Sequence, residues 1–280
     1  MIRNLFVLTI FALLSGAACQ TQNPATITNQ TSNIAAGNSV NLTTKNAAAS
    51  SGNSENAAAQ TINFDAPDGV RIVGTFYGAR AENSPAVLML HQYGGKRADY
   101  KDLAQQFQAS GIAVLAIDGR GFGDSTKKAD GSMVAASQSN EAVAGMKSDV
   151  SAAVKFLGEQ KNVDKTRIGI IGASYGSSLA IIHAGDDASS KAVALLSPGT
   201  NYFGNLPTMP AIEKYGSRPI LIVAAEDDAE SAAASRGLDK LAAGDKHQLQ
   251  IYKKGGHGTG ILTAGVGLDK TLLEFFRQTL

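Results

Sequence analysis

Cysteine is nearly absent from this sequence: Cys19 is the only one, so no internal disulfide can form. An excess of charge is absent as well, because 25 basic residues are balanced by 24 acidic ones. Lysine and arginine form no cluster beyond isolated pairs, which excludes the basic surface that binds nucleic acid. No spacing of His, Cys and Asp typical of a metal site is present, and no cofactor is indicated. The composition therefore gives no support for a disulfide framework, a nucleic-acid partner or a metal site.

Long apolar runs are also missing, and the apolar segment 5–14 is too short to span a bilayer. It follows Arg3, and the small residues 15–18 come after it as at a secretory cleavage site. The position of Cys19 resembles that of the lipidated cysteine in bacterial lipoproteins. This resemblance implies a signal peptide at 1–19 and an exported protein held in the membrane of the bacterial cell envelope through Cys19. An ordinary signal peptide on a secreted protein is the alternative.

Residues 20–60 consist mostly of Asn, Thr, Ser, Ala, Gln and Gly, with few and irregularly spaced large apolar residues. Such a segment buries too little apolar surface to offset the entropy lost on ordering, so we expect a disordered linker. Residues 61–280 have the length of one α/β domain with a single core.

Apolar strands alternate with helical patterns along residues 61–280. Strands are expected at 62–64, 70–77, 86–90, 112–117, 168–171, 192–196, 219–225 and 248–252, and helices at 98–109, 141–159, 175–184, 229–242 and 269–278. A turn separates the first two strands, which should form an antiparallel hairpin. The others are continuously apolar, which predicts a mostly parallel sheet with helices on both faces.

The segment Gly-Ala-Ser-Tyr-Gly at 172–176 lies between a predicted strand and a predicted helix. In this context a Gly-x-Ser-x-Gly sequence is typical of a nucleophilic serine. The strained turn would expose the hydroxyl of Ser174 at the carboxyl edge of the sheet, with the N–H of Tyr175 pointing to where an oxyanion forms. Elsewhere the same sequence only closes a turn, so the interpretation requires a base and an acid.

Four histidines are candidates for the base. His183 is flanked by isoleucines in a predicted helix, which favours packing, and His247 lies in a polar turn. His91 ends a strand and enters the loop 92–95. His257 stands in a glycine-rich loop after the strand 248–252, where its ring can reach over the edge of the sheet, and we select it as the base.

The acid should follow a strand that lies between Ser174 and His257 in the sequence. The strand 218–225 runs into three acidic residues, Glu226, Asp227 and Asp228. A group of acids after a strand is often only a solvated turn, and the residues alone leave all three open.

From about Ile62 to the C-terminus the chain resembles the α/β-hydrolases, close to the small lidless branch that includes dienelactone hydrolases and serine acyl hydrolases. Four segments carry the resemblance: 91–95, 118–125, the turn at Ser174, and the Asp228 and His257 pair. The order Ser, Asp, His matches that family. The resemblance implies a three-layer α/β-hydrolase fold and favours Asp228 over Asp227, because the acid usually falls three residues after a small residue that ends its strand.

The same resemblance implies the remaining site residues. The backbone N–H groups of Tyr93 and Tyr175 would form the oxyanion hole, with that of Gln92 as the alternative to Tyr93. Gln92 stands where the family often has glycine. Asp118 and Arg120 would brace the site without reacting.

The segment 197–217 is too short for a large cap domain, so an open cleft is expected. Its apolar residues could line that cleft or pack as core beneath a loop: Tyr202, Phe203, Leu206 and Met209.

The predicted function is a serine hydrolase that cleaves carboxylic esters of small molecules through Ser174, His257 and Asp228. The same triad could serve a peptidase or a thioesterase, because a fold does not determine the leaving group. A different class is a non-catalytic lipoprotein that uses the scaffold for binding. The intact serine, acid and histidine favour the enzyme.

Overall fold

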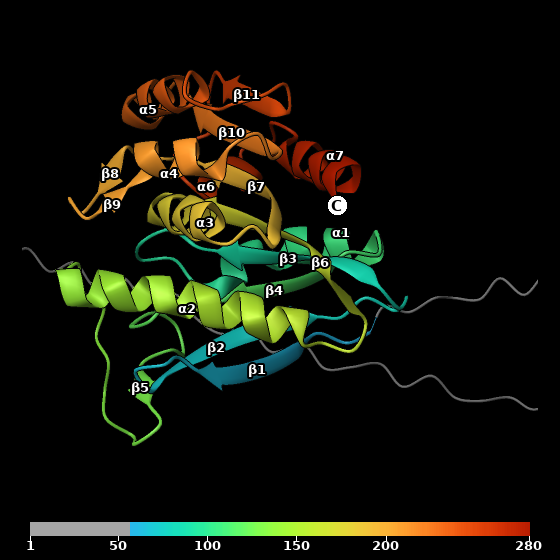
Figure 1. Cartoon of the computed structure of the whole chain (residues 1–280), viewed down its shortest axis with the longest axis vertical. Helices are drawn as coiled ribbons and strands as arrows, with labels where there is room; N and C mark the ends of the chain where they lie inside the picture. The colour runs from blue at the N-terminus through green and yellow to red at the C-terminus, as the bar shows by residue number, and fades with distance from the viewer. Residues whose placement is uncertain (1–56) are drawn as a thin grey trace, which may run out of the picture. The chain divides into compact units, whose positions relative to one another are not determined.

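A computed structural model of the chain describes residues 57–280 (Figure 1). The predicted signal peptide and Cys19 lie outside the described residues, as does most of the predicted linker. The first strand begins at Gln60, the last residue of the range 20–60. None of the helices in 57–280 is both long and apolar enough to cross a membrane.

Strands and helices alternate through the chain as the apolar pattern predicts. The strands are β1 (Gln60–Asp65), β2 (Val70–Tyr77), β3 (Ser84–Leu90), β4 (Ala113–Ile117), β5 (Lys127–Lys128), β6 (Val163–Ala173), β7 (Ser190–Leu196), β8 (Asn201–Tyr202), β9 (Leu206–Pro207), β10 (Ile220–Ala225) and β11 (His247–Tyr252). The helices are η1 (Arg97–Tyr100), α1 (Lys101–Ala109), α2 (Asn140–Gly158), α3 (Tyr175–Asp186), α4 (Thr208–Tyr215), α5 (Ala229–Asp239), α6 (Gly260–Thr263) and α7 (Leu268–Thr279).

The main sheet has the strand order β1-β2-β4-β3-β6-β7-β10-β11, with β5 beside β2. The strands β4, β3, β6, β7, β10 and β11 run parallel, whereas β1, β2 and β5 are antiparallel to their neighbours. The predicted opening hairpin is therefore confirmed as β1 and β2. Because the parallel strands end at one edge of the sheet, the loops after β3, β6, β7, β10 and β11 meet there.

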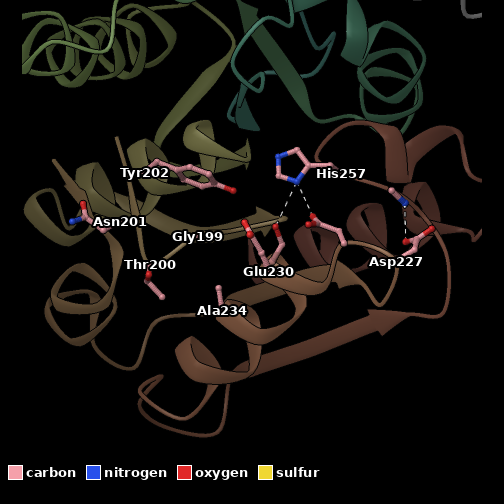
Figure 2. Close-up of a pocket in the computed structure, with 11 residues that line it drawn as sticks. Gly199, Thr200, Asn201, Tyr202, Asp227, Glu230, Ala234 and His257 are labelled. Atoms are coloured by element: carbon pink, nitrogen blue, oxygen red, sulfur yellow. Dashed lines mark hydrogen bonds and ion pairs between the residues drawn. The ribbon is translucent and has the colours of Figure 1, made fainter. Parts of the chain in front are cut away.

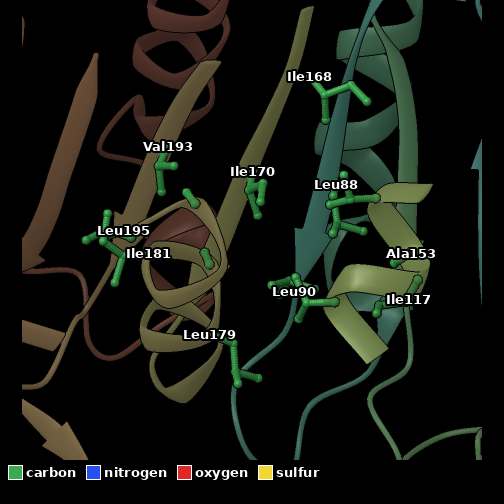
Figure 3. Packing of buried hydrophobic residues seen from close by; sticks show 14 of the residues in the cluster. Leu88, Leu90, Ile117, Ala153, Ile168, Ile170, Leu179, Ile181, Val193 and Leu195 are labelled. Carbon is green, nitrogen blue, oxygen red and sulfur yellow. The ribbon is translucent and has the colours of Figure 1, made fainter. Parts of the chain in front are cut away.

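Helices cover both faces of the sheet, which confirms the three-layer prediction (Figure 1). In β3, Leu88 and Leu90 pack under the layer that contains α2 and α3, while Val87 and Met89 face α1 and α7. Figure 3 shows Leu88 and Leu90 in one buried cluster with Leu179 of α3 and Ala153 of α2. Burial on both faces explains why these strands are apolar throughout instead of alternating.

The segment after β7 contains short elements that the apolar pattern does not reveal. A two-stranded hairpin, β8 and β9, is followed by α4, and no large cap is present in this part of the described chain. Leu206 is fully buried, so it belongs to the core, whereas Met209 is 43% exposed. Tyr202 and Phe203, at the tip of β8, lie at the edge where the parallel strands end.

Candidate active site

Ser174 lies in the turn between β6 and α3, in a backbone conformation that is strained for a residue with a side chain. Its φ is 54° and its ψ is −124°. The backbone N–H of Ser174 donates to the carbonyl of Leu196 at the end of β7, at 2.8 Å, which holds the turn against the sheet. Non-glycine residues with positive φ cluster at functional sites, where the surrounding structure compensates the strain.

The two glycines of the turn are required by close backbone contacts. A Cβ atom on Gly172 would lie 2.1 Å from the carbonyl oxygen of Gly176. A Cβ atom on Gly176 would lie 2.7 Å from the carbonyl oxygens of Leu90 and His91. The spacing Gly-x-Ser-x-Gly therefore permits α3 to begin directly against the end of β3.

His257 connects Ser174 to Asp228. Its Nε2 lies 2.7 Å from Ser174 Oγ, and its Nδ1 lies 2.7 Å from Asp228 Oδ2. Figure 2 shows the ring of His257 on the loop that follows β11. Because Asp228 Oδ2 can only accept a hydrogen bond, the ring proton of neutral His257 lies on Nδ1. Nε2 is therefore free to accept the hydroxyl proton of Ser174.

The three acidic residues after β10 have different partners. Glu226 forms an ion pair with Arg236, while Asp227 accepts backbone N–H groups from Gly255 at 3.1 Å and Gly256 at 3.0 Å. Asp228 alone among the three is hydrogen-bonded to His257. Asp227 therefore holds the loop that carries His257, and Asp228 holds its ring.

Asp228 remains ionised despite its partial burial. Burial opposes the charge, but the hydroxyls of Ser231 and Ser197 and the ring of His257 outweigh that effect and lower the pKa of Asp228. A carboxylate in this position fixes the imidazole tautomer and stabilises the imidazolium.

Ser197, the first residue after β7, connects several of these groups and was not identified from the sequence. It is fully buried and has a φ of 48°. Its Oγ accepts the N–H of Gly258 at 2.8 Å, and its carbonyl accepts the hydroxyl of Tyr202 at 2.9 Å. Its place at the carboxyl end of a strand was the one available signal.

The predicted oxyanion donors lie in adjacent segments. Tyr175 is the first residue of α3, so its N–H has no acceptor within the helix. Tyr93 lies in the loop after β3, and its ring is 5.8 Å from that of Tyr175. Within 57–280, neither N–H donates to another backbone or side-chain group. Both are therefore available to an incoming oxyanion.

Gln92 bridges the two loops through its side chain. Its Oε1 accepts both the backbone N–H and the hydroxyl of Thr259, at 2.6 and 2.8 Å. A Cβ atom on Gly258 would lie 2.2 Å from the same oxygen. The glutamine that replaces the family's glycine thus ties the Tyr93 loop to the His257 loop.

His91 is buried beneath the site in its neutral form. Its Nδ1 donates to the carbonyl of Gln92 at 2.7 Å, and its Nε2 accepts the N–H of Gly119 at 2.9 Å. Burial lowers the pKa of His91, which favours this neutral tautomer. The remaining histidines lie elsewhere: His183 is packed in α3 near Ser151, and His247 begins β11.

Asp118 and Arg120 are both occupied by ion pairs. Asp118 is fully buried and pairs with Arg97. Arg120 makes a bidentate pair with Asp149, at 2.8 and 2.7 Å, and a second pair with Asp68. Burial raises the pKa of Asp149 to about 6 even though Arg120 opposes the shift.

The two sides of Ser174 differ in chemistry. On one side the rings of Tyr93, Phe122 and Phe203 surround Tyr175, with centroid distances of 4.9 Å from Tyr93 to Phe122 and 5.2 Å from Tyr93 to Phe203. On the other side lies an open cleft of about 580 Å³ (Figure 2). Its lining consists of Gly199, Thr200, Asn201, Tyr202, Asp227, Asp228, Glu230, Ser231, Ala234, Gly256 and His257.

The model of the dienelactone hydrolase family matches residues 72–260, which is more than half of the chain. The chain belongs to the dienelactone hydrolase family. This membership confirms the α/β-hydrolase fold and makes the chain a hydrolase.

The chain is also similar to individual proteins in sequence or in structure. An uncharacterized protein of Mycobacterium tuberculosis is 27% identical over 240 residues, which cover 79% of this chain and 80% of that protein. A thiohydrolase of Arthrinium phaeospermum is 31% identical over 140 residues, or 50% of this chain and 43% of that protein. The solved structure of a dienelactone hydrolase from Anabaena variabilis matches with a TM-score of 0.62 at 16% identity, covering 80% of this chain and 98% of its own.

Proposed function

We propose that this hydrolase cleaves carboxylic esters of small molecules through a Ser174, His257 and Asp228 triad. The observation that carries the proposal is the continuous pair of 2.7 Å contacts from Ser174 through the ring of His257 to Asp228. A serine hydroxyl becomes an effective nucleophile only when such a base removes its proton.

In the first half of the reaction, Ser174 Oγ attacks the ester carbonyl carbon while its proton passes to His257 Nε2. The carbonyl oxygen becomes an oxyanion, which the N–H groups of Tyr93 and Tyr175 stabilise; loss of one such donor costs about 10²–10³ in rate. The bond to the leaving oxygen then breaks, and that oxygen takes the proton from His257. An alcohol departs and the acyl group stays on Ser174.

In the second half, water attacks the acyl-enzyme carbonyl and gives a proton to His257 Nε2. The bond to Ser174 Oγ breaks, and Oγ recovers the proton from His257. One ester and one water thus yield one acid and one alcohol. Asp228 stays ionised throughout and stabilises the imidazolium, consistent with the low pKa of this carboxyl.

The test is hydrolysis of nitrophenyl butyrate by Ser174→Ala, with Ser148→Ala, at a half-buried position of α2, as the matched control. We expect Ser174→Ala to lose turnover while its melting temperature stays close to that of the wild type, and Ser148→Ala to keep both. Hydrolysis by Ser174→Ala at the wild-type rate would refute the assignment.

Thioester hydrolysis is the second candidate, supported by the similarity to the thiohydrolase of Arthrinium phaeospermum. The triad chemistry is the same, with a thiol as leaving group. Hydrolysis of butyryl thioesters and butyryl esters of matched size would separate the two, and an aminoacyl amide would test peptidase activity. A protein that binds small molecules without turning any of them over would instead support the non-catalytic alternative.

We further propose that the protein is exported and anchored to a membrane of the bacterial cell envelope through lipid on Cys19. The proposal depends on the short apolar segment and the small residues before this cysteine.

A further inference from the structure

The position of His257 determines which side of Ser174 receives the leaving alcohol. His257 Nε2 must reach the leaving oxygen to protonate it, so the alcohol departs on the side of this ring. The 580 Å³ cleft is lined by His257 and Asp228 but by neither Tyr93 nor Tyr175. Given the proposed ester hydrolysis, the cleft is therefore the site of the alcohol, and the acyl group lies toward the aromatic rings.

Tyr202 presents a hydrogen-bond acceptor to that cleft. Its single hydroxyl proton is donated to the carbonyl of Ser197 at 2.9 Å, so its oxygen has only lone pairs left for a ligand. The ring is half-buried, and its hydroxyl lies beside those of Ser174 and Ser231. Figure 2 shows this hydroxyl directed toward His257.

Apart from His257 and Tyr202, the ionisable side chains that line the cleft are acidic. Asp227, Asp228 and Glu230 line it, and no lysine or arginine is among its lining residues in the described chain. Asp228 is occupied by His257 and Asp227 by the backbone of the glycine loop. Glu230 is exposed and forms no ion pair within residues 57–280, so its carboxylate is open to a ligand.

The tip of β8 separates the two sides of the site. Tyr202 faces the cleft, while Phe203, the next residue, packs against Tyr93 and Tyr175. Phe203 has a φ of 57°, a strained value for a bulky residue. This backbone turns adjacent side chains toward opposite sides of Ser174.

We propose that Tyr202 and Glu230 are specificity-determining residues, which select esters whose leaving alcohol carries hydrogen-bond donors, above all an ammonium group. Hydroxyl-bearing alcohols use the same acceptors without the charge. A carboxylate on the alcohol finds no lysine or arginine among the lining residues of the cleft and is repelled by Glu230 and Asp227. The acyl group contacts the aromatic rings, so the selection of the acyl group is independent of the selection of the alcohol.

The test compares four butyrate esters that differ only in the alcohol: dimethylaminoethyl, glyceryl, isopentyl and carboxymethyl. The dimethylaminoethyl and isopentyl esters have the same shape, but the first carries an ammonium N–H where the second carries a C–H. The value of kcat/KM for each is divided by its rate of alkaline hydrolysis, which removes the intrinsic reactivity of the leaving group. We expect the order dimethylaminoethyl, glyceryl, isopentyl, carboxymethyl, with about tenfold between the first and third, as for a hydrogen bond to a charged group.

Two variants assign the preference to the residues. Tyr202→Phe and Glu230→Gln should each lower the dimethylaminoethyl-to-isopentyl ratio by about threefold or more. Glu274→Gln, on the exposed surface of α7, is the matched control and should leave the ratio unchanged. A ratio does not respond to a general loss of activity or folding, so a merely structural role for Tyr202 would not change it.

The outcomes separate this inference from the proposed function. If nitrophenyl butyrate is hydrolysed in a Ser174-dependent manner but the four esters react alike or in the reverse order, the inference is wrong and the proposed function stands. An unchanged ratio in both Tyr202→Phe and Glu230→Gln also overturns it. If none of these esters is hydrolysed, nitrophenyl butyrate included, the proposed function is wrong and the inference that rests on it falls as well.

Discussion

The hydroxyl of Ser197 accepts the backbone N–H of Gly258 at 2.8 Å, and this contact joins the end of β7 to the residue that follows His257. The same serine contributes to the low pKa of Asp228. One buried hydroxyl thus positions both the base and the acid of the proposed triad.

Ser197→Ala should lower kcat by about tenfold, because a small displacement of the base weakens proton transfer. It leaves the N–H of Gly258 without its partner, at a cost of about 1–3 kcal/mol. A denaturant unfolding curve of the same variant separates positioning from stability, because a purely structural role would leave the kcat of the folded protein unchanged. Ser235→Ala is the matched control: that hydroxyl is buried but has no partner within residues 57–280. Equal kinetics for the two variants would contradict this role.

The glycine loop offers a matched pair of substitutions. Gly256 and Gly258 have φ values of 68° and 61°, so an alanine at either position pays a similar backbone strain. Alanine at Gly256 meets open space, whereas alanine at Gly258 meets the side chain of Gln92 at 2.2 Å. We expect Gly258→Ala to lose at least about tenfold more activity, because the clash displaces His257 from Ser174. Equal activities in an ester assay would show that the link through Gln92 does not position the base.

The buried pair of Arg120 and Asp149 should respond to substitution in a pH-dependent way. Arg120→Met leaves the Asp149 carboxylate buried without its partner, which costs about 3–5 kcal/mol at neutral pH. Burial already raises the pKa of Asp149 from 3.8 to about 6. A carboxyl with a raised pKa binds its proton more tightly in the folded state, so the stability it contributes is present at low pH and is lost as pH rises.

Denaturant unfolding measured from about pH 5 to 8 should therefore show Arg120→Met losing stability relative to the wild type as pH rises. Arg71→Met, which breaks the exposed pair with Asp65, is the control and should show little effect. A loss for Arg120→Met that does not vary with pH would argue against the buried charge as its cause.

Cys19→Ala tests the proposed anchor. With two or more acyl chains, each buried CH₂ contributing about 0.8 kcal/mol, the wild type should sediment with membranes. The variant lacks the only thiol and should appear in the soluble fraction, with ester hydrolysis retained. Mass spectrometry of the mature N-terminus checks the lipid directly, and an unmodified Cys19 in a soluble wild type would instead support ordinary secretion.

The architecture could be predicted from the sequence because burial on both faces leaves a plain apolar signal in each central strand. The range 86–90 matches β3 within two residues, and 192–196 matches β7 equally well. The short elements after β7 left no such signal: β8 and β9 have two residues each, too few for any periodicity. The helix expected at 229–242 ends at Asp239, where Gly237 and the polar residues around it weaken the helix.

The candidate triad could be selected from sequence because each member follows a strand at the same edge of the sheet. The residues that position the triad could not, because their roles depend on tertiary contacts between distant loops. Gln92 and Thr259 are far apart in the chain, and nothing near either residue indicates the other. Nothing in the sequence distinguishes Ser197 from the other serines, because its role depends on the contact of its buried hydroxyl with the N–H of Gly258.

The most direct test of the proposed triad is reaction of the purified protein with a fluorophosphonate, read by intact mass and peptide mapping. A serine that has transferred its proton to His257 attacks the phosphorus and displaces fluoride, so we expect one adduct per chain, located on Ser174 and absent from His257→Ala. Absence of an adduct from folded wild-type protein, or an adduct on another residue, would show that Ser174 is not an activated nucleophile.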